Sequence, residues 1–325
     1  MNQMFMEIWE RPSARRSLFF ILVYLSLLSI DFSNLYEGTN FVLGLTTQIE
    51  LTRGIMAAAI VLNFVLIKRL PNRTQLYVTW VELLVLFLYF FYSFDLSYDF
   101  IWSRLPHLLG FGLKSGFLMG AALTIFICAV SIAFSTILAL IAALARLSNN
   151  GMALGISTFY ISFFRGTPLL LQILLVYLGL PQIGIILDPI PAAIIALSLC
   201  YGAYMAEIFR AGIQAIPAGQ REAAIALGLT DSQVMRLVIF PQAIRLIVPP
   251  TGNQFIAMLK DSSLVSVLGA WELMYMSRTH GRAEFKYMEM LISAALIYWM
   301  LSIGFELVQA RIERKFGKGI DVNNG

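Results

Sequence analysis

Long apolar runs, repeated along the chain, are the feature that most constrains its fold. A run of about 20 apolar residues can cross the hydrocarbon core of a bilayer as one helix. Charged residues make up only 13% of the sequence, about half the share that is usual in soluble domains. We therefore predict an all-α integral membrane protein with eight transmembrane helices, at residues 17–35, 49–67, 76–94, 117–145, 157–180, 190–210, 240–260 and 287–308.

The positions of the basic residues predict the orientation of these helices. In an eight-helix arrangement, arginine and lysine gather in the segments on one side, while the opposite loops carry mainly aspartate and glutamate. Basic side chains in short loops stay in the cytoplasm. We therefore expect both termini and the polar stretch at residues 219–233 to be cytoplasmic. Residues 260–286 are mixed in charge and are expected outside, where "SLVSVLGAWELMYM" could re-enter the membrane.

Several classes of function find no support in the sequence. Cys128 and Cys200 lie in apolar runs, and His107 and His280 are far apart in the chain, so no metal site is expected. No window matches a phosphate-binding loop of the G-x-x-x-x-G-K-[ST] kind. A net charge of +4 without a clustered basic face argues against nucleic-acid binding. The first apolar run follows "RPSARR" without a cleavage pattern, so we expect it to be retained.

One polar stretch, "GQREAAIALGLTDSQ" at residues 219–233, interrupts the apolar runs. It predicts a short helix over 216–228, with Pro217 in its first turn and Gly228 in a left-handed position at its end. Thr230 and Gln233 fit a capping box that begins a second helix. Pro241 then marks the end of that helix or a kink. We call residues 216–241 the elbow.

The composition of the elbow leaves its role open between two interpretations. Ala223 and Ala224 would let another surface approach the helix closely, and Glu222 offers one charge to a partner cation. This pattern suits docking into a groove of another protein. An amphipathic helix lying on the membrane surface is the alternative. A DNA-binding role is less favoured because the stretch lacks a dense basic face.

The same stretch resembles a known signature. "EAAIALG", nine residues, then "VIFP" is similar to the signature loop of ATP-binding cassette (ABC) importer permeases, in which Glu222, Ala223, Ala224, Gly228 and Pro241 match and Val238 and Phe240 are mild apolar replacements. The resemblance extends over about 116–315 and includes "FRGTPLLLQ" and "PQAIRLIVPPTGNQFIAMLKDSSLVSV". Together these segments look like the polar amino-acid branch, the histidine/glutamine/glutamate-type permeases.

This resemblance implies a division of the chain and a set of partners. Residues 116–315 would form a five-helix type I permease core, with three extra helices in 17–115 and cytoplasmic segments at 1–16 and 316–325. The elbow would be the coupling helix of a multi-pass protein of the bacterial inner membrane. The implied partners are a cytoplasmic ABC ATPase dimer that binds the ATP and Mg, a second permease subunit (the same or homologous), an extracytoplasmic binding protein and a polar amino acid. The chain would hold no cofactor and would be no enzyme.

Two groups of residues are candidates for the substrate path. Cys200, Tyr204 and Glu207 lie near one helical face, although Glu207 could simply pair with Arg210. The second group is Asn253, Lys260, Asp261 and Ser262, which offers both charges and the donors that an amino acid needs. An interfacial ion pair between Lys260 and Asp261 is the alternative for the charged pair. "FRGTP" breaks a helix either as a scaffold kink or as part of a gate.

Two rival classes need features that are weak here. A secondary amino-acid transporter with a regulatory elbow would need ion-coupling residues near the midplane and usually shows repeated halves. A membrane enzyme would need a nucleophile–base pair or a metal constellation. Two histidines far apart in the sequence argue against the enzyme.

Overall fold

The computed structural model describes residues 12–27, 45–92, 94, 96–110 and 119–316; the regular elements in these ranges are helices joined by turns and loops, with one isolated bridge between Gly120 and Glu272. Its internal contacts divide the chain into a unit of residues 1–95 and a unit of residues 96–325. The helix that precedes the core boundary expected at 116, α5 (Tyr98–Leu109), belongs to the second unit and packs on its helices α13 (Leu273–Ala283) and α14 (Tyr287–Phe316).

The first unit consists of helices with apolar surfaces. Its elements are α2 (Pro12–Leu27), α3 (Leu45–Ile67) and α4 (Asn72–Tyr92). None of the described residues of α4 is buried, and its leucine and aromatic side chains point outward. Apolar surface all round a helix is typical of a membrane span. Glu82 of α4, isolated in the sequence, accepts a hydrogen bond from the Asn63 amide of α3 at 3.0 Å.

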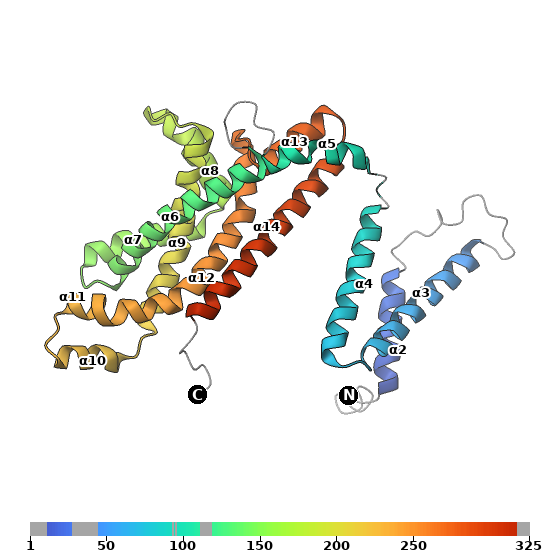
Figure 1. Cartoon of the computed structure of the whole chain (residues 1–325), viewed down its shortest axis with the longest axis horizontal. Helices are drawn as coiled ribbons and strands as arrows, with labels where there is room; N and C mark the ends of the chain where they lie inside the picture. Colours follow the sequence, from blue (N-terminus) through green and yellow to red (C-terminus); the bar gives the residue numbers. More distant parts are fainter. Residues whose placement is uncertain (1–11, 28–44, 93, 95, 111–118, 317–325) are drawn as a thin grey trace. The chain divides into compact units, whose positions relative to one another are not determined.

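The second unit contains the remaining elements (Figure 1). After α5 these are α6 (Gly120–Leu147), α7 (Gly151–Gly166), α8 (Leu169–Leu174), the π-helical η2 (Leu175–Gly179), the 3₁₀ segment η3 (Leu180–Ile183), α9 (Pro189–Gln214), α10 (Ala218–Ala226), α11 (Asp231–Gln233), the π-helical η4 (Val234–Ile239), α12 (Phe240–Asp261), the 3₁₀ segment η5 (Ser262–Leu268), α13 (Leu273–Ala283) and α14 (Tyr287–Phe316).

Within the described residues, six helices are long and apolar enough to cross a membrane, or up to seven segments if one bent helix pair is a single span. The bent pair is α7 with α8–η3, whose axes meet at 109°. The single helix expected over 157–180 is therefore wrong in form. The first expected helix, 17–35, is only partly covered, because residues 28–35 lie outside the described ranges. The count of eight stays a prediction.

The bend after α7 follows from one proline and is stabilised by one glutamine. Thr167, which precedes Pro168, is extended (φ −117°, ψ 148°) because a proline disfavours helical geometry in the residue before it. The Gln172 amide donates to the Phe164 carbonyl at 2.8 Å and to the Thr167 carbonyl at 3.0 Å. Gln172 thus satisfies carbonyl groups that the break removes from the helix, which an apolar environment requires.

Small side chains allow α6 and α9 to pack closely. Their buried faces consist mainly of alanine, serine, cysteine and glycine. Ser135 of α6 donates to the Ser198 carbonyl at 3.2 Å, and Ser198 donates to the Ser131 carbonyl at 3.3 Å. A Cβ added at Gly202 would lie 2.6 Å from the Tyr160 hydroxyl of α7. Close approach through small residues is the usual way in which membrane helices associate.

The elbow and α13 lie at opposite ends of α12. The chain leaves α10, passes through α11 and η4 into α12, and reaches η5 and α13 only after the full length of α12 (Figure 1). It then returns through α14, which packs along α12. Groups on the elbow and groups on α13 are therefore separated by the length of a membrane-spanning helix.

Candidate functional site

The elbow forms as the sequence predicts at its turn. Gly228 has a φ of +80°, the left-handed conformation that favours glycine after a helix. Its amide donates to the Ile225 carbonyl at 2.9 Å, and the Leu229 amide donates to the Ala224 carbonyl at 3.2 Å. The Gln233 side chain accepts from the Thr230 amide at 2.9 Å, which confirms the capping box.

Polar contacts then tie the two sides of the elbow together. Arg221 of α10 pairs with Asp231 of α11 at 2.7 Å. The side-chain amide of Gln242 in α12 donates to the side-chain oxygen of Gln220 in α10 at 3.2 Å. The turn and these contacts define one fixed shape for the elbow.

The two signature alanines of the elbow face in different directions. Ala224 is buried in a cluster that also contains Val234, Ile239 and Ala243. Its small size is therefore explained by packing inside the elbow, where α10 lies against η4. Ala223 and Glu222 are exposed, so they are the two signature residues of α10 that a partner can reach.

Two exposed apolar side chains lie close to these residues in the sequence. Leu227 is 82% exposed and Ile225 is 50% exposed. Ile225 belongs to the short polar helix α10 and Leu227 directly follows it, and both lie outside the candidate spans. Burial of either side chain against another surface would be favourable. The exposed face of the elbow therefore combines the Glu222 carboxylate, the small residue Ala223 and two exposed aliphatic side chains.

Pro241 does not end the helix that begins at Asp231. Helical geometry continues from Asp231 to Leu268, and Pro241 lies in the first turn of α12, directly after the π-helical η4. Proline lacks the amide hydrogen that an α-helix would use, and a π segment is a common adjustment at such a site. Of the two outcomes expected for Pro241, an end or a kink, the end is wrong.

Glu207, a candidate for the substrate path, lies in an ion-pair cluster. Its carboxylate accepts from Arg210 at 2.8 Å and lies 3.6 Å from an Arg146 nitrogen of α6. The ion pair with Arg210, expected as the alternative, is thus confirmed. The cluster joins α6 and α9 at the ends of these helices that lie toward the elbow.

Tyr204, one turn before Glu207, also faces an arginine. The Arg165 guanidinium lies over its ring, 5.4 Å from the ring centroid. A cation over an aromatic face is attracted by the ring quadrupole. Arg165 belongs to the last turn of α7, so this contact ties α9 to the helix just before the bend.

A second polar contact joins α9 to the far end of α12. The Tyr201 hydroxyl donates to the Asp261 carboxylate at 2.7 Å. Lys260 and Asp261 form no ion pair with one another in the described part of the chain, so that alternative is not supported. Tyr201 is buried whereas Asp261 and Lys260 are exposed. Sequence reasoning missed Tyr201, because its partner lies 60 residues away.

The other candidates of the substrate path are not brought together in one site. Cys200 is buried, with its thiol 3.9 Å from the Phe164 carbonyl. Ser262 is buried and donates to the Leu259 carbonyl at 2.7 Å. Asn253 is exposed in the middle of α12. Only Asp261 and Lys260 therefore present charged groups at an accessible surface near Tyr201.

Glu272, which sequence reasoning missed, joins α13 and α14. It is fully buried and caps α13 by accepting from the Met274 amide at 2.9 Å and the Tyr275 amide at 2.6 Å. It also accepts from the Tyr298 hydroxyl of α14 at 2.9 Å. Burial raises the pKa of the Glu272 carboxyl to about 7. A glutamate before "LMYM" is the one sequence signal, as a helix N-cap.

The two histidines, far apart in the sequence, lie close together in the structure. The rings of His107 on α5 and His280 on α13 are 5.8 Å apart between centroids. Burial, and then the charge of Arg104, lowers the pKa of His280. No group of three or more metal-ligating side chains occurs among the described residues.

Comparison with known proteins identifies the family. A family model described as the inner membrane component of binding-protein-dependent transport systems matches residues 135–318. The chain belongs to this family. The match falls entirely within the second unit, which carries the elbow, α12 and α13.

Curated relatives and a solved structure agree with this family. The chain is 42% identical over 199 residues to the arginine transport system permease protein of Bacillus subtilis (61% of this chain, 91% of the relative). It is 32% identical over 217 residues to the glutamine transport system permease protein of Escherichia coli K12 (66% and 95%). A crystal structure of an amino acid ABC transporter with histidines matches with a TM-score of 0.62 and 35% identity (68% and 99%).

Membership of the family decides between the classes left open by the sequence. This chain is a multi-pass membrane component of a transport system, and neither a secondary transporter nor a membrane enzyme is favoured. The elbow, the Glu207 cluster and the Tyr201–Asp261 contact are therefore parts of a permease.

Proposed function

We propose that this permease subunit imports a polar amino acid by alternating access, driven by a separate ATPase dimer that docks on the elbow. The two relatives described above are named as arginine and glutamine transport permeases, which supports the substrate class. The elbow supports the docking site, because Leu227, Ile225 and Glu222 are exposed on a short helix whose shape is fixed from within. This exposed face is the observation that carries the proposal.

The same proposal orients the chain in the membrane. An ATPase dimer is cytoplasmic, so the elbow is cytoplasmic and α13, at the other end of α12, faces outside. Both termini then lie in the cytoplasm, as the basic residues predict. Two permease subunits would enclose the path, and an extracytoplasmic binding protein would deliver the amino acid to it.

The Tyr201–Asp261 contact is the part of the substrate path that the geometry supports best. Asp261 is an accessible carboxylate held by a buried hydroxyl, and it can attract the ammonium group that every amino acid carries. Lys260, beside it and without an ion pair in the described residues, can attract the carboxylate. Glu207 is better explained as a structural partner of Arg146 and Arg210.

Reconstitution tests the proposal. The chain is co-expressed with its neighbouring ATPase and binding-protein genes, the complex is purified, and uptake of radiolabelled amino acids is measured in vesicles. We expect uptake that needs ATP, the ATPase and the binding protein together. Uptake by the chain alone, driven by an ion gradient, would show a secondary transporter and refute the proposal.

A further inference from the structure

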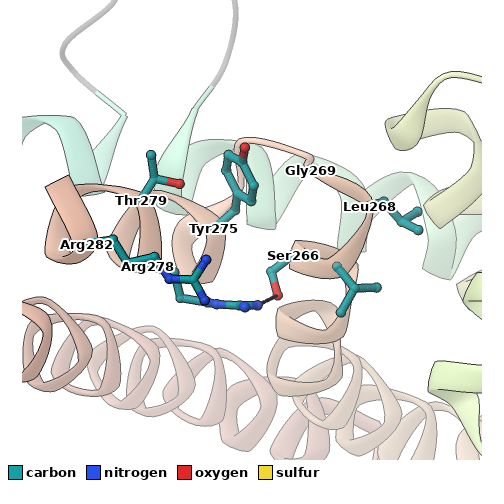
Figure 2. Close-up of a pocket in the computed structure, with 8 residues that line it drawn as sticks. Ser266, Leu268, Gly269, Tyr275, Arg278, Thr279 and Arg282 are labelled. Carbon is teal, nitrogen blue, oxygen red and sulfur yellow. Dashed lines mark hydrogen bonds between the residues drawn. The ribbon is translucent and has the colours of Figure 1, made fainter.

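A pocket of about 500 Å³ lies where η5 meets α13, at the end of α12 opposite the elbow. Its polar lining comes from the side chains of Ser266, Tyr275, Arg278, Thr279 and Arg282. Figure 2 shows Arg278 and Arg282 on the same side of α13, with Arg278 reaching toward Ser266. The Arg278 guanidinium donates to the Ser266 hydroxyl at 3.5 Å.

Two arginines in this arrangement need an explanation. Arg278 and Arg282 stand four residues apart on one helix, and like charges at this spacing destabilise a helix by about 0.2–0.5 kcal/mol. A basic residue in the last turn of a helix is favoured by the helix dipole, which explains Arg282. Arg278 lies in the middle of α13, where the dipole gives no such benefit.

The nearby carboxylates are engaged elsewhere. Glu284 pairs with Arg104 of α5 at 3.1 Å, and Glu289 lies 3.8 Å from the Lys286 ammonium. Glu272 influences Arg278 through its charge, but its oxygens are used by two backbone amides and the Tyr298 hydroxyl. Among the described residues, neither Arg278 nor Arg282 forms an ion pair. The pocket therefore offers two guanidinium groups and three hydroxyls to an anion from outside the chain.

We propose that this pocket receives an acidic side chain of the extracytoplasmic binding protein. The inference rests on the proposed function, which places α13 outside the membrane, and on a family defined by its dependence on a binding protein. The planar guanidinium group forms paired hydrogen bonds with a carboxylate. Ser266, Tyr275 and Thr279 add hydroxyl groups around the same space.

An exposed aromatic residue favours a protein as the source of the carboxylate. Phe285, three residues after Arg282, is 96% exposed and has a φ of 56°. A left-handed backbone is unfavourable for a bulky residue. The turn therefore holds the Phe285 ring outward in a conformation that is energetically unfavourable. Aromatic residues and arginine are enriched at the centres of protein interfaces. Because Phe285 follows Arg282 by three residues, we include it with the two arginines in the proposed docking surface.

The test measures how the binding protein stimulates ATP hydrolysis by the complete complex. The probe is the purified binding protein that supports uptake in the reconstitution experiment. Arg278→Gln and Arg282→Gln should each raise its half-maximal concentration by about tenfold without a fall in the maximal stimulated rate. Arg69→Gln is the matched control, since it removes an exposed arginine from the first unit. Arg278→Glu should lose stimulation by the wild-type binding protein. Replacing the acidic residue of the binding protein that enters the pocket with lysine should restore stimulation of this variant.

Lipid composition separates a protein carboxylate from a phosphate headgroup. The assays are run in nanodiscs of phosphatidylcholine alone and in nanodiscs that also contain phosphatidylglycerol. An effect that occurs only with phosphatidylglycerol would assign the pocket to lipid and overturn the inference. The inference would also be overturned if the half-maximal concentrations for Arg278→Gln and Arg282→Gln equalled that for Arg69→Gln in both lipids. A wild-type complex that no binding protein stimulates would overturn the proposed function itself, and the pocket inference with it.

Discussion

Leu227 gives the sharpest test of the elbow as a docking element. Leu227→Ala removes three carbon groups from a side chain that is 82% exposed in the free subunit. Each buried carbon group contributes about 0.8 kcal/mol, so docking that covers this side chain fully would lose about 2 kcal/mol. The affinity for the ATPase should then fall by about thirtyfold.

The assay is the dissociation constant between the detergent-solubilised subunit and its purified ATPase. Ile186→Ala is the matched control. Ile186 is an aliphatic residue of the same size, 83% exposed, in the loop that leads into α9 at the end away from the elbow. A loss of less than about threefold for Leu227→Ala, or an equal loss for Ile186→Ala, would refute the elbow as the docking element.

Leucine substitutions of the two signature alanines should have different effects, one on the stability of the subunit and the other on its binding to the ATPase. Ala224 is buried within the elbow, so Ala224→Leu should destabilise the subunit by about 1–3 kcal/mol through overpacking. Ala223 is exposed, so Ala223→Leu should leave the thermal stability unchanged and weaken only ATPase binding. If both variants lowered stability equally, Ala223 would not be a surface residue of the elbow.

Three further predictions follow from the rest of the unit. Tyr201→Phe and Asp261→Asn should both reduce amino-acid uptake. The loss for Asp261→Asn should be tenfold or more, because a charged hydrogen-bond partner contributes about 2–5 kcal/mol. Normal uptake kinetics in both variants would show that the contact is only structural. The pKa of Glu272 is about 7 in the folded protein, against 4.5 for an ordinary glutamate. The free energy of unfolding should therefore fall by up to about 3 kcal/mol as the pH rises between these two values. Thermal unfolding of Glu272→Gln should lack this dependence on pH, and an unchanged dependence would contradict the prediction. Reporter fusions at Asn40 and Asp99 should be external and those at Arg73 and Gly325 internal, and a cytoplasmic Asp99 would overturn the orientation.

The features predicted correctly from sequence depend on neighbours in the chain. The left-handed Gly228, the capping box of Thr230 and Gln233, and the pair of Glu207 with Arg210 all span three or four residues. Such spacings are fixed by helix geometry itself. The expected helices over 190–210 and 240–260 likewise follow from local apolar length.

The features that were missed depend on packing between distant segments. The inward direction of Ala224 is set by η4, the partner of Asp261 lies 60 residues away, and His107 and His280 meet across α5 and α13. The 109° bend needed Gln172 to satisfy the carbonyls that the break leaves free. A hydrophobic pattern states that a residue is buried or exposed but not which helix covers it.

α12 is the element that connects the two proposed docking surfaces. It begins at the elbow, ends at the η5 segment that lines the arginine pocket, and contains Pro249 and Pro250 between them. Gln309 of α14 donates to the Pro249 carbonyl at 2.6 Å, and a Cβ added at Gly252 would lie 1.6 Å from the Gln309 side chain. α14 is therefore closely fitted to α12 beside its prolines, and a turn of α12 at this point would change its contacts with Gln309. Energy from a partner at one end can bias the other only if the two ends differ in their contacts between two states. α12 and α14 also meet through Phe255 and Phe305, so the junction at the prolines is one of several contacts between them that two such states could exchange.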